Sequence, residues 1–207
     1  MKLLNKNKIV ILKIKNKMAK RESSFINMLV TLFAVSLIAS ISLAAVYNVT
    51  KEPIAKSKAL KKEKAISNVL PEFDRIETFK VFPSTGKDSI EFNMAFKGED
   101  TVGIAIETYT DNGFGGRIKA MVGIKHDGTV YDVFHLEHTE TPGLGDKVDK
   151  SKSTWSDQFK GKISDNFPLI VKKDGGNVDA ITAATITSRA YCDAINRAYE
   201  TYKKWRE

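Results

Sequence analysis

The sequence predicts an α+β protein in which a single N-terminal transmembrane helix precedes one domain, built from a mainly antiparallel sheet and a packed C-terminal helix. Three observations support this prediction. Residues 25–49 contain no charged side chain. Four β-patterned runs follow one another between residues 90 and 137, with turn signals between them. Apolar residues recur at helical spacing over residues 188–205.

The N-terminal tail, residues 1–24, carries most of the net charge of +8. It holds eight basic side chains and one acidic side chain, whereas the rest of the chain holds 25 basic and 24 acidic ones. A domain with nearly balanced charge lacks the basic surface on which nucleic-acid binding depends. We therefore expect no nucleic-acid partner.

Residues 25–49 are long enough for a membrane span, because a helix of this length extends about 37 Å and the hydrocarbon core is about 30 Å thick. A cleavable signal peptide is the alternative, since residues 42–44 resemble a small-residue cleavage site. Its apolar core would be only about 7–15 residues long, so we favour a retained single-pass anchor in membrane lipid. The basic tail predicts a cytoplasmic N-terminus, with the domain on the periplasmic or extracellular side of the cell membrane.

Residues 50–89 predict a stalk helix and linker, with Pro53 in the first turn and Pro71 after the end of the helix. The domain is expected over residues 90–207. Its predicted strands cover residues 90–96, 102–110, 117–124 and 129–137. Asp127 and Gly128 favour a tight hairpin turn between the last two strands.

Beyond the strands, residues 151–161 predict a short helix and residues 168–175 a further strand and turn. The apolar face of the terminal helix, residues 188–205, is expected to pack on the sheet.

Cysteine and histidine usage limits the chemistry that the chain can perform alone. Cys192 is the single cysteine, so neither an intrachain disulfide nor a thiolate metal cluster can form. His135 and His138 could in principle share a metal ion, but a surface pair is the commoner explanation, and we predict no metal site. Redox chemistry would require a bound cofactor, and no residue is predicted to be catalytic.

Two glycine-rich segments, residues 112–118 and 140–148, interrupt the strand pattern. Neither opens a long helix after a strand, so the dinucleotide-binding fingerprint is absent. Each alone is more typical of a turn. Residues 140–145 nevertheless combine a proline with two glycines, which exposes backbone amides that a flat ligand or a phosphate can approach.

The segment "DAITAATITS", residues 179–188, concentrates four hydroxyl side chains before the terminal helix. Thr187 or Ser188 fits the N-cap of that helix. Thr185 would then lie just upstream, where the helix dipole and Arg189 could stabilise a phosphate. Threonine does not attack a phosphoanhydride unaided, so a separate enzyme would have to form an ester there.

Three motifs, "GFGGRIKAMVGI", "HLEHTETPGLGDKV" and "DAITAATITS", occur in this order behind the N-terminal span. Together they resemble the FMN-binding G subunit of the Rnf electron-transport complex, and the related C subunit of the sodium-translocating NADH:quinone oxidoreductase shares the domain. The resemblance covers the whole chain in layout and residues from about 90 to 207 in motif.

The resemblance implies that a flavin transferase attaches FMN through its phosphate to Thr185. Asp179, Thr182, Ala184 and Thr187 match other positions of the attachment motif. The candidate non-covalent contacts are Glu140, Thr141, Gly143, Leu144 and Gly145. Two residues depart from the family pattern: Ala183 replaces a glycine of the motif, and Phe114 replaces a tyrosine.

The implied function is that of an electron-carrier subunit in a membrane-bound, Na⁺- or H⁺-translocating ferredoxin:NAD oxidoreductase complex. The partners would be the other subunits of an Rnf-type complex. The chain would be an enzyme component without catalysis of its own. Two alternatives stay open: the C subunit of the quinone reductase, and a membrane-anchored module that binds or senses FMN reversibly.

Overall fold

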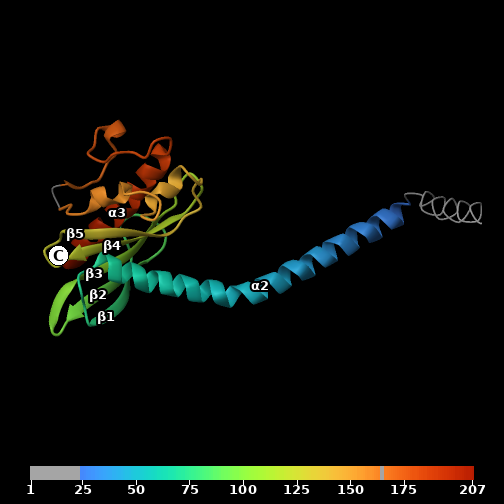
Figure 1. Cartoon of the computed structure of the whole chain (residues 1–207), viewed down its shortest axis with the longest axis horizontal. Coiled ribbons are helices and arrows are strands. Elements are labelled where there is room, and N and C mark those ends of the chain that lie inside the picture. Colours follow the sequence, from blue (N-terminus) through green and yellow to red (C-terminus); the bar gives the residue numbers. More distant parts are fainter. Residues whose placement is uncertain (1–23, 164–165) are drawn as a thin grey trace, which may run out of the picture. The chain divides into compact units, whose positions relative to one another are not determined.

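The computed structural model describes residues 24–163 and 166–207, and the chain divides into two compact units at Lys56 and Ser57. The predicted basic tail lies, apart from Ser24, outside the described residues. Figure 1 shows the elements in sequence colours.

The described part of the first unit is Ser24 and the N-terminal part of helix α2 (Phe25–Val69). By length and composition this helix could cross a membrane, and its apolar side chains from residue 25 to residue 49 are exposed. Pro53 lies inside α2, so the expectation that it opens a separate stalk helix is wrong. Proline removes one main-chain hydrogen bond, whereas the alanine and lysine residues that follow favour continuation of the helix.

The second unit is built on a five-stranded antiparallel sheet in the order β1-β2-β3-β4-β5. The strands are β1 (Arg75–Val81), β2 (Ile90–Lys97), β3 (Asp100–Thr110), β4 (Ile118–Lys125) and β5 (Val130–Glu137). The four predicted strands and the predicted antiparallel arrangement are confirmed.

Strand β1 was not anticipated, because residues 50–89 were expected to form only the stalk helix and linker. The sheet therefore begins before residue 90. Its apolar residues Ile76, Phe79 and Val81 are only partly buried, and they do not alternate regularly with polar residues, so the strand carries no clear period of two. Its pairing with β2, from Arg75 opposite Phe96 to Val81 opposite Ile90, supplies the main-chain hydrogen bonds that define it.

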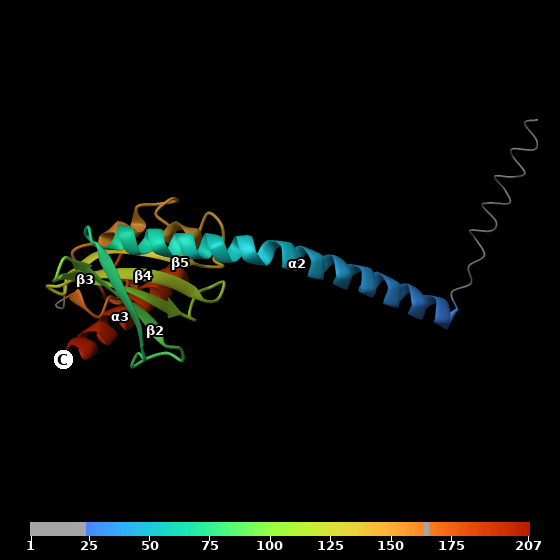
Figure 2. The ribbon, with the colours of Figure 1, turned by 90° about the horizontal axis from the view of Figure 1, so that it is seen from below.

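Each face of the sheet is covered by a helix (Figure 2). Helix α3 (Thr185–Arg206) covers one face, where Tyr191 and Ile195 pack with the apolar side chains of β2, β3 and β4. The C-terminal end of α2 covers the other face. A Cβ on Gly123 of β4 would lie 1.6 Å from the Val69 carbonyl oxygen, so only glycine permits this close approach.

Between β5 and α3 the chain forms the 3₁₀ helices η1 (Gly145–Val148), η2 (Trp155–Phe159) and η4 (Lys172–Asp174). The short helix predicted at 151–161 corresponds to η2. The strand predicted at 168–175 is wrong: Val171 forms only an isolated parallel bridge with Val178. Leu169 and Val171 are buried against the core, so their apolar character reflects packing rather than a sheet ladder.

Candidate functional site

A cleft of about 340 Å³ opens where three segments meet: the loop between β3 and β4, the loop after β5, and the start of α3. Its lining residues are Phe114, Glu140, Thr141, Leu144, Gly145, Ala183, Ala184, Thr185, Ile186 and Thr187. The fold thus brings together the three motifs that carry the family resemblance. Of the predicted site residues, Gly143, Asp179 and Thr182 do not line the cleft.

Glu140 joins all three segments of the cleft. Its side chain is 5% exposed. One carboxylate oxygen accepts a hydrogen bond from the Gly115 backbone N–H at 2.9 Å, and the other accepts a hydrogen bond from the Thr187 hydroxyl. Both oxygens are therefore engaged by protein groups, and the carboxylate acts as an internal brace of the site.

The glycines next to Glu140 are required by close packing. A Cβ on Gly145 would lie 2.8 Å from both a Glu140 carboxylate oxygen and the Thr187 hydroxyl. A Cβ on Gly115 would lie 2.0 Å from the Thr139 carbonyl oxygen. Gly143 differs, because it has a φ of 79° and open space where a side chain would be. Its loop therefore leaves the backbone accessible.

A tight turn leads into α3. Ala183 has a φ of 61°, and it is the single non-glycine residue with positive φ within residues 24–163 and 166–207. Ala184 follows as the N-cap, without a side-chain hydrogen bond, and the helix begins at Thr185. The turn thus uses a left-handed conformation at Ala183, the position where the sequence departs from the glycine of the family pattern it resembles.

The N-cap prediction for Thr187 or Ser188 is wrong, because α3 starts earlier than expected and both residues lie within its first turns. The Ser188 hydroxyl accepts a hydrogen bond from the Ile181 backbone N–H and donates one to the Ala184 carbonyl oxygen. It thereby holds the turn closed from inside the helix. Thr187 and Ser188 are both buried, whereas Thr185 is partly exposed at the cleft.

The cation next to Thr185 is Lys173, whose Nζ lies 3.2 Å from the Thr185 hydroxyl oxygen. The sequence did not indicate this residue, because twelve positions separate the two and only the fold of η4 brings them together. Arg189, expected to face a phosphate, instead donates two hydrogen bonds of 2.7 Å to Asp174. Two parallel hydrogen bonds to one carboxylate match the planar geometry of the guanidinium group.

Asp179 and Thr182 lie outside the cleft on the segment that precedes the turn. The Asp179 carboxylate is exposed and pairs with Lys172 at 2.8 Å. Its backbone N–H donates to the Gln158 side chain at 2.8 Å, and its carbonyl accepts from the Trp155 indole N–H at 2.6 Å. Thr182 is exposed. These contacts fix the path of the chain towards Thr185.

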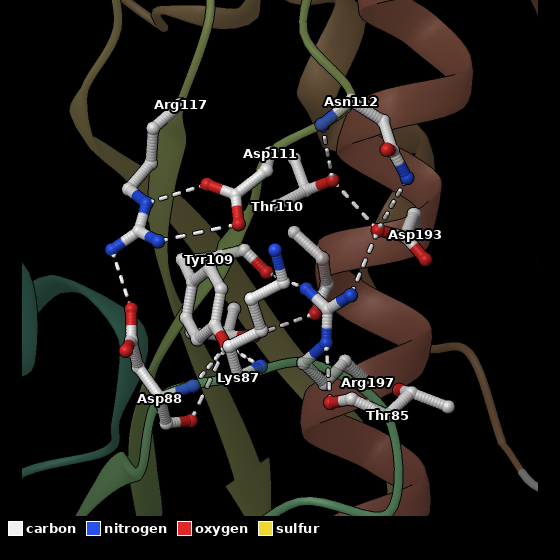
Figure 3. Close-up of polar contacts among 12 residues, drawn as sticks. Thr85, Lys87, Asp88, Tyr109, Thr110, Asp111, Asn112, Arg117, Asp193 and Arg197 are labelled. Carbon is white, nitrogen blue, oxygen red and sulfur yellow. Dashed lines mark hydrogen bonds and ion pairs between the residues drawn. The ribbon is translucent and has the colours of Figure 1, made fainter.

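The loop between β3 and β4 is anchored at its base by a network around Tyr109 (Figure 3). The guanidinium carbons of Arg117 and Arg197 lie 4.5 Å and 4.9 Å from the centre of the Tyr109 ring. Arg197 is buried and donates to the carbonyl oxygens of Thr85 and Tyr109. Arg117 pairs with Asp111 at 2.6 Å, and this hydrogen bond lowers the pKa of the Asp111 carboxyl.

The histidines singled out by the sequence occupy a different environment from a metal site. His135 is buried, with its Nε2 atom 3.2 Å from the Lys61 ammonium and its ring 4.8 Å from that of His138. Burial, and then the charge of Lys61, lowers the pKa of His135 to about 4. Within the described part of the chain, no group of three or more metal-ligating side chains is present.

Comparison with known proteins agrees with this geometry. The FMN-binding domain family matches residues 113–200, which contain all three cleft segments. The chain is similar to proteins named as the G subunit of an ion-translocating oxidoreductase complex. One, from Shewanella baltica, is 51% identical over 100 residues, 47% of each chain. Another, from Escherichia coli O157:H7, is 35% identical over 164 residues, 75% of this chain and 80% of that protein.

The match with the G subunit from Aliivibrio fischeri extends further, at 34% identity over 192 residues, and covers 87% of this chain and 90% of that protein. Against the relatives from three Shewanella species the chain spans about half of their length. The similarity to the Escherichia coli and Aliivibrio fischeri proteins covers at least three quarters of this chain, which is sufficient to assign it to their family. This chain belongs to the G-subunit family of ion-translocating oxidoreductase complexes.

Proposed function

We propose that this chain is the covalent-FMN electron carrier of a membrane-bound, ion-translocating ferredoxin:NAD oxidoreductase complex, with the FMN phosphate esterified to Thr185. The observation that carries the proposal is the position of Thr185: a partly exposed hydroxyl at the edge of a cleft built by three separate motifs. The other hydroxyls of the first turns of α3, on Thr187 and Ser188, are buried and hydrogen-bonded within the protein.

The residues of the cleft fit a flavin. Its volume of about 340 Å³ lies at the lower end of the range for ligand pockets, about 300–1,000 Å³. Three apolar side chains at its edge, Phe114, Leu144 and Ile186, are 69%, 39% and 48% exposed, so they offer unpartnered surface to a flat aromatic ring. Thr141 adds a polar group to the cleft, and Gly143, which lies between the lining residues Thr141 and Leu144 in the sequence, has open space beside its backbone. A phosphate at Thr185 would lie at the N-terminus of α3.

The attachment step requires a separate flavin transferase with FAD as donor. In that step the Thr185 oxygen would form a bond to the FMN phosphorus as the pyrophosphate bond of FAD breaks. AMP would leave with the bridging oxygen, and the hydroxyl proton would pass to a base of the transferase. Lys173 is the side chain found next to this hydroxyl, and an ammonium cannot serve as that base.

Once attached, FMN supplies electron transfer, and the protein holds it. The tether removes dissociation of the cofactor, which matters for a domain outside the cytoplasm. Residues 25–49 would anchor the chain in the cell membrane with the N-terminal tail in the cytoplasm and the domain on the other side. Its partners would be the other subunits of an Rnf-type complex, which would supply the nucleotide and iron–sulfur sites.

The test is flavin fluorescence of the denatured chain after co-expression with a flavin transferase. We expect a fluorescent band for the wild type and for Thr154→Ala, because the exposed Thr154 side chain lies outside the cleft and outside the three motifs of the family resemblance. Thr185→Ala should be dark. A dark wild type, or a fluorescent Thr185→Ala variant, would contradict the proposal. Flavin released from the wild type by acid precipitation would instead favour a reversible FMN-binding module.

A further inference from the structure

The three consecutive residues of η4 contact, in order, three residues of the segment 179–189, which we call the attachment segment. The Lys172 ammonium pairs with the Asp179 carboxylate at 2.8 Å. The Lys173 ammonium contacts the Thr185 hydroxyl at 3.2 Å. The Asp174 carboxylate accepts two hydrogen bonds from Arg189. The single turn of η4 therefore lies beside the chain from Asp179 to the second turn of α3.

The geometry of this turn is held by its own backbone. Gly175 ends η4 with a φ of 87°. A Cβ on Gly176 would lie 2.1 Å from the Ile170 carbonyl oxygen, so a larger residue there would displace the turn. The bridge between Val171 and Val178 closes the loop behind it. The side chain of Lys173 therefore starts from a fixed position.

The charges of the three contacts are not equivalent. Lys172 and Asp174 each face a group of opposite sign, so those two contacts are neutral as pairs. Lys173 faces a neutral hydroxyl, and in the described part of the chain no carboxylate oxygen lies within ion-pair distance of its ammonium. The pKa of the Asp174 carboxyl is lowered by its hydrogen bonds to Arg189 and, to a smaller extent, by the charge of Lys173. Arg189 is the other cation near Thr185 along α3. Its guanidinium group already donates two hydrogen bonds to the Asp174 carboxylate. The positive charge left without a paired carboxylate is thus placed at Thr185.

We propose that Lys173 is the counter-charge of the phosphoester at Thr185, a positioning residue that holds the FMN tether by a charge-assisted hydrogen bond. This inference rests on the proposed function, because it needs an ester at Thr185. A phosphodiester carries one negative charge and accepts hydrogen bonds through its free oxygens. An ammonium that already reaches the Thr185 oxygen is placed to donate to an oxygen on the attached phosphorus. Asp174 keeps Arg189 away from the same role.

The test compares melting temperatures of the flavinylated and the unmodified chain, prepared with and without the transferase, for wild type, Lys173→Ala, Lys173→Glu and Lys173→Arg. Lys204→Ala, an exposed lysine at the far end of α3, is the matched control for loss of one charge. We expect the unmodified forms of the Lys173 variants to melt like the unmodified wild type. The change in melting temperature caused by flavinylation should fall by about 2–4 °C in Lys173→Ala and further in Lys173→Glu.

Lys173→Arg and Lys204→Ala should retain the wild-type change. Added salt should reduce the change in the wild type and leave Lys173→Ala unaffected, because salt screens an exposed charge pair. The ³¹P resonance of the ester should also move in Lys173→Ala and stay in place in Lys204→Ala. A flavinylated Lys173→Ala variant that matches the wild type in both measurements overturns the role of Lys173 alone. A wild type that takes up no flavin overturns the proposed function as well.

Discussion

Glu140 and Thr187 are hydrogen-bonded to each other in the interior of the cleft, although they are 47 positions apart in sequence. This contact ties the loop after β5 to the first turn of α3. The second Glu140 oxygen reaches Gly115 of the loop between β3 and β4, so one buried carboxylate sets the spacing of all three cleft segments.

Removing the Glu140 brace should loosen the cleft. In Glu140→Leu the Gly115 N–H and the Thr187 hydroxyl both lose the buried carboxylate that accepts their hydrogen bonds. We expect the free energy of unfolding to fall by about 1–3 kcal/mol. Chemical denaturation measures this loss. Thr187→Ser keeps the hydroxyl and should lose less than Thr187→Val, and equal losses in the two Thr187 variants would show that the hydrogen bond is unimportant.

Ala183→Gly should stabilise the domain. Ala183 has a φ of 61°, and an alanine in the left-handed region costs about 1 kcal/mol relative to glycine, partly offset by the greater flexibility of glycine in the unfolded chain. We expect a gain of about 0.5 kcal/mol in denaturant unfolding. Ala190→Gly, in the buried interior of α3, is the control and should destabilise the domain by about 1 kcal/mol or more. A loss in Ala183→Gly comparable to the control would contradict the strained turn.

The buried His135 predicts a pH dependence of stability. Its pKa is lowered to about 4 in the folded chain from an ordinary value of 6.5, so the unfolded chain binds more protons between these two values. Stability should therefore be fully present above about pH 6.5 and fall as the pH drops towards 4, by at most about 3 kcal/mol. Urea unfolding of wild type, His135→Gln and His126→Asn measures this. His126 is exposed, so His126→Asn should keep the wild-type slope and His135→Gln should flatten it.

The two arginines on either side of Tyr109 should differ in their contribution to stability. Arg197 is 7% exposed, and Arg197→Met leaves the carbonyl oxygens of Thr85 and Tyr109 without their donor. We expect a loss of about 2–4 kcal/mol. The Arg117 side chain is 41% exposed, and its ion pairs with Asp88 and Asp111 are screened by water, so Arg117→Met should cost about 1 kcal/mol or less. Denaturant unfolding of both variants tests this, and equal losses would be inconsistent with the burial of Arg197.

Much of the fold is encoded locally. The predictions for β2 to β5 and for most of α3 are confirmed, since each carries an apolar period of its own and the Asp127-Gly128 turn is unambiguous. β1 was missed because it is only partly buried and depends on its pairing with β2. The start of α3 was missed because its N-cap is Ala184, which lacks the side-chain oxygen by which N-caps are recognised.

By itself, the sequence determined the apolar N-terminal segment, the order of the motifs, and Thr185 as the candidate attachment hydroxyl. Tertiary structure alone decided what surrounds that hydroxyl. Lys173 lies beside Thr185 because η4 folds back along the attachment segment, and Glu140 is an internal brace because its two partners come from distant loops. These contacts could not be predicted from the sequence, because a periodic pattern concerns residues that are close in the chain. Contacts between distant side chains depend on how separate elements pack.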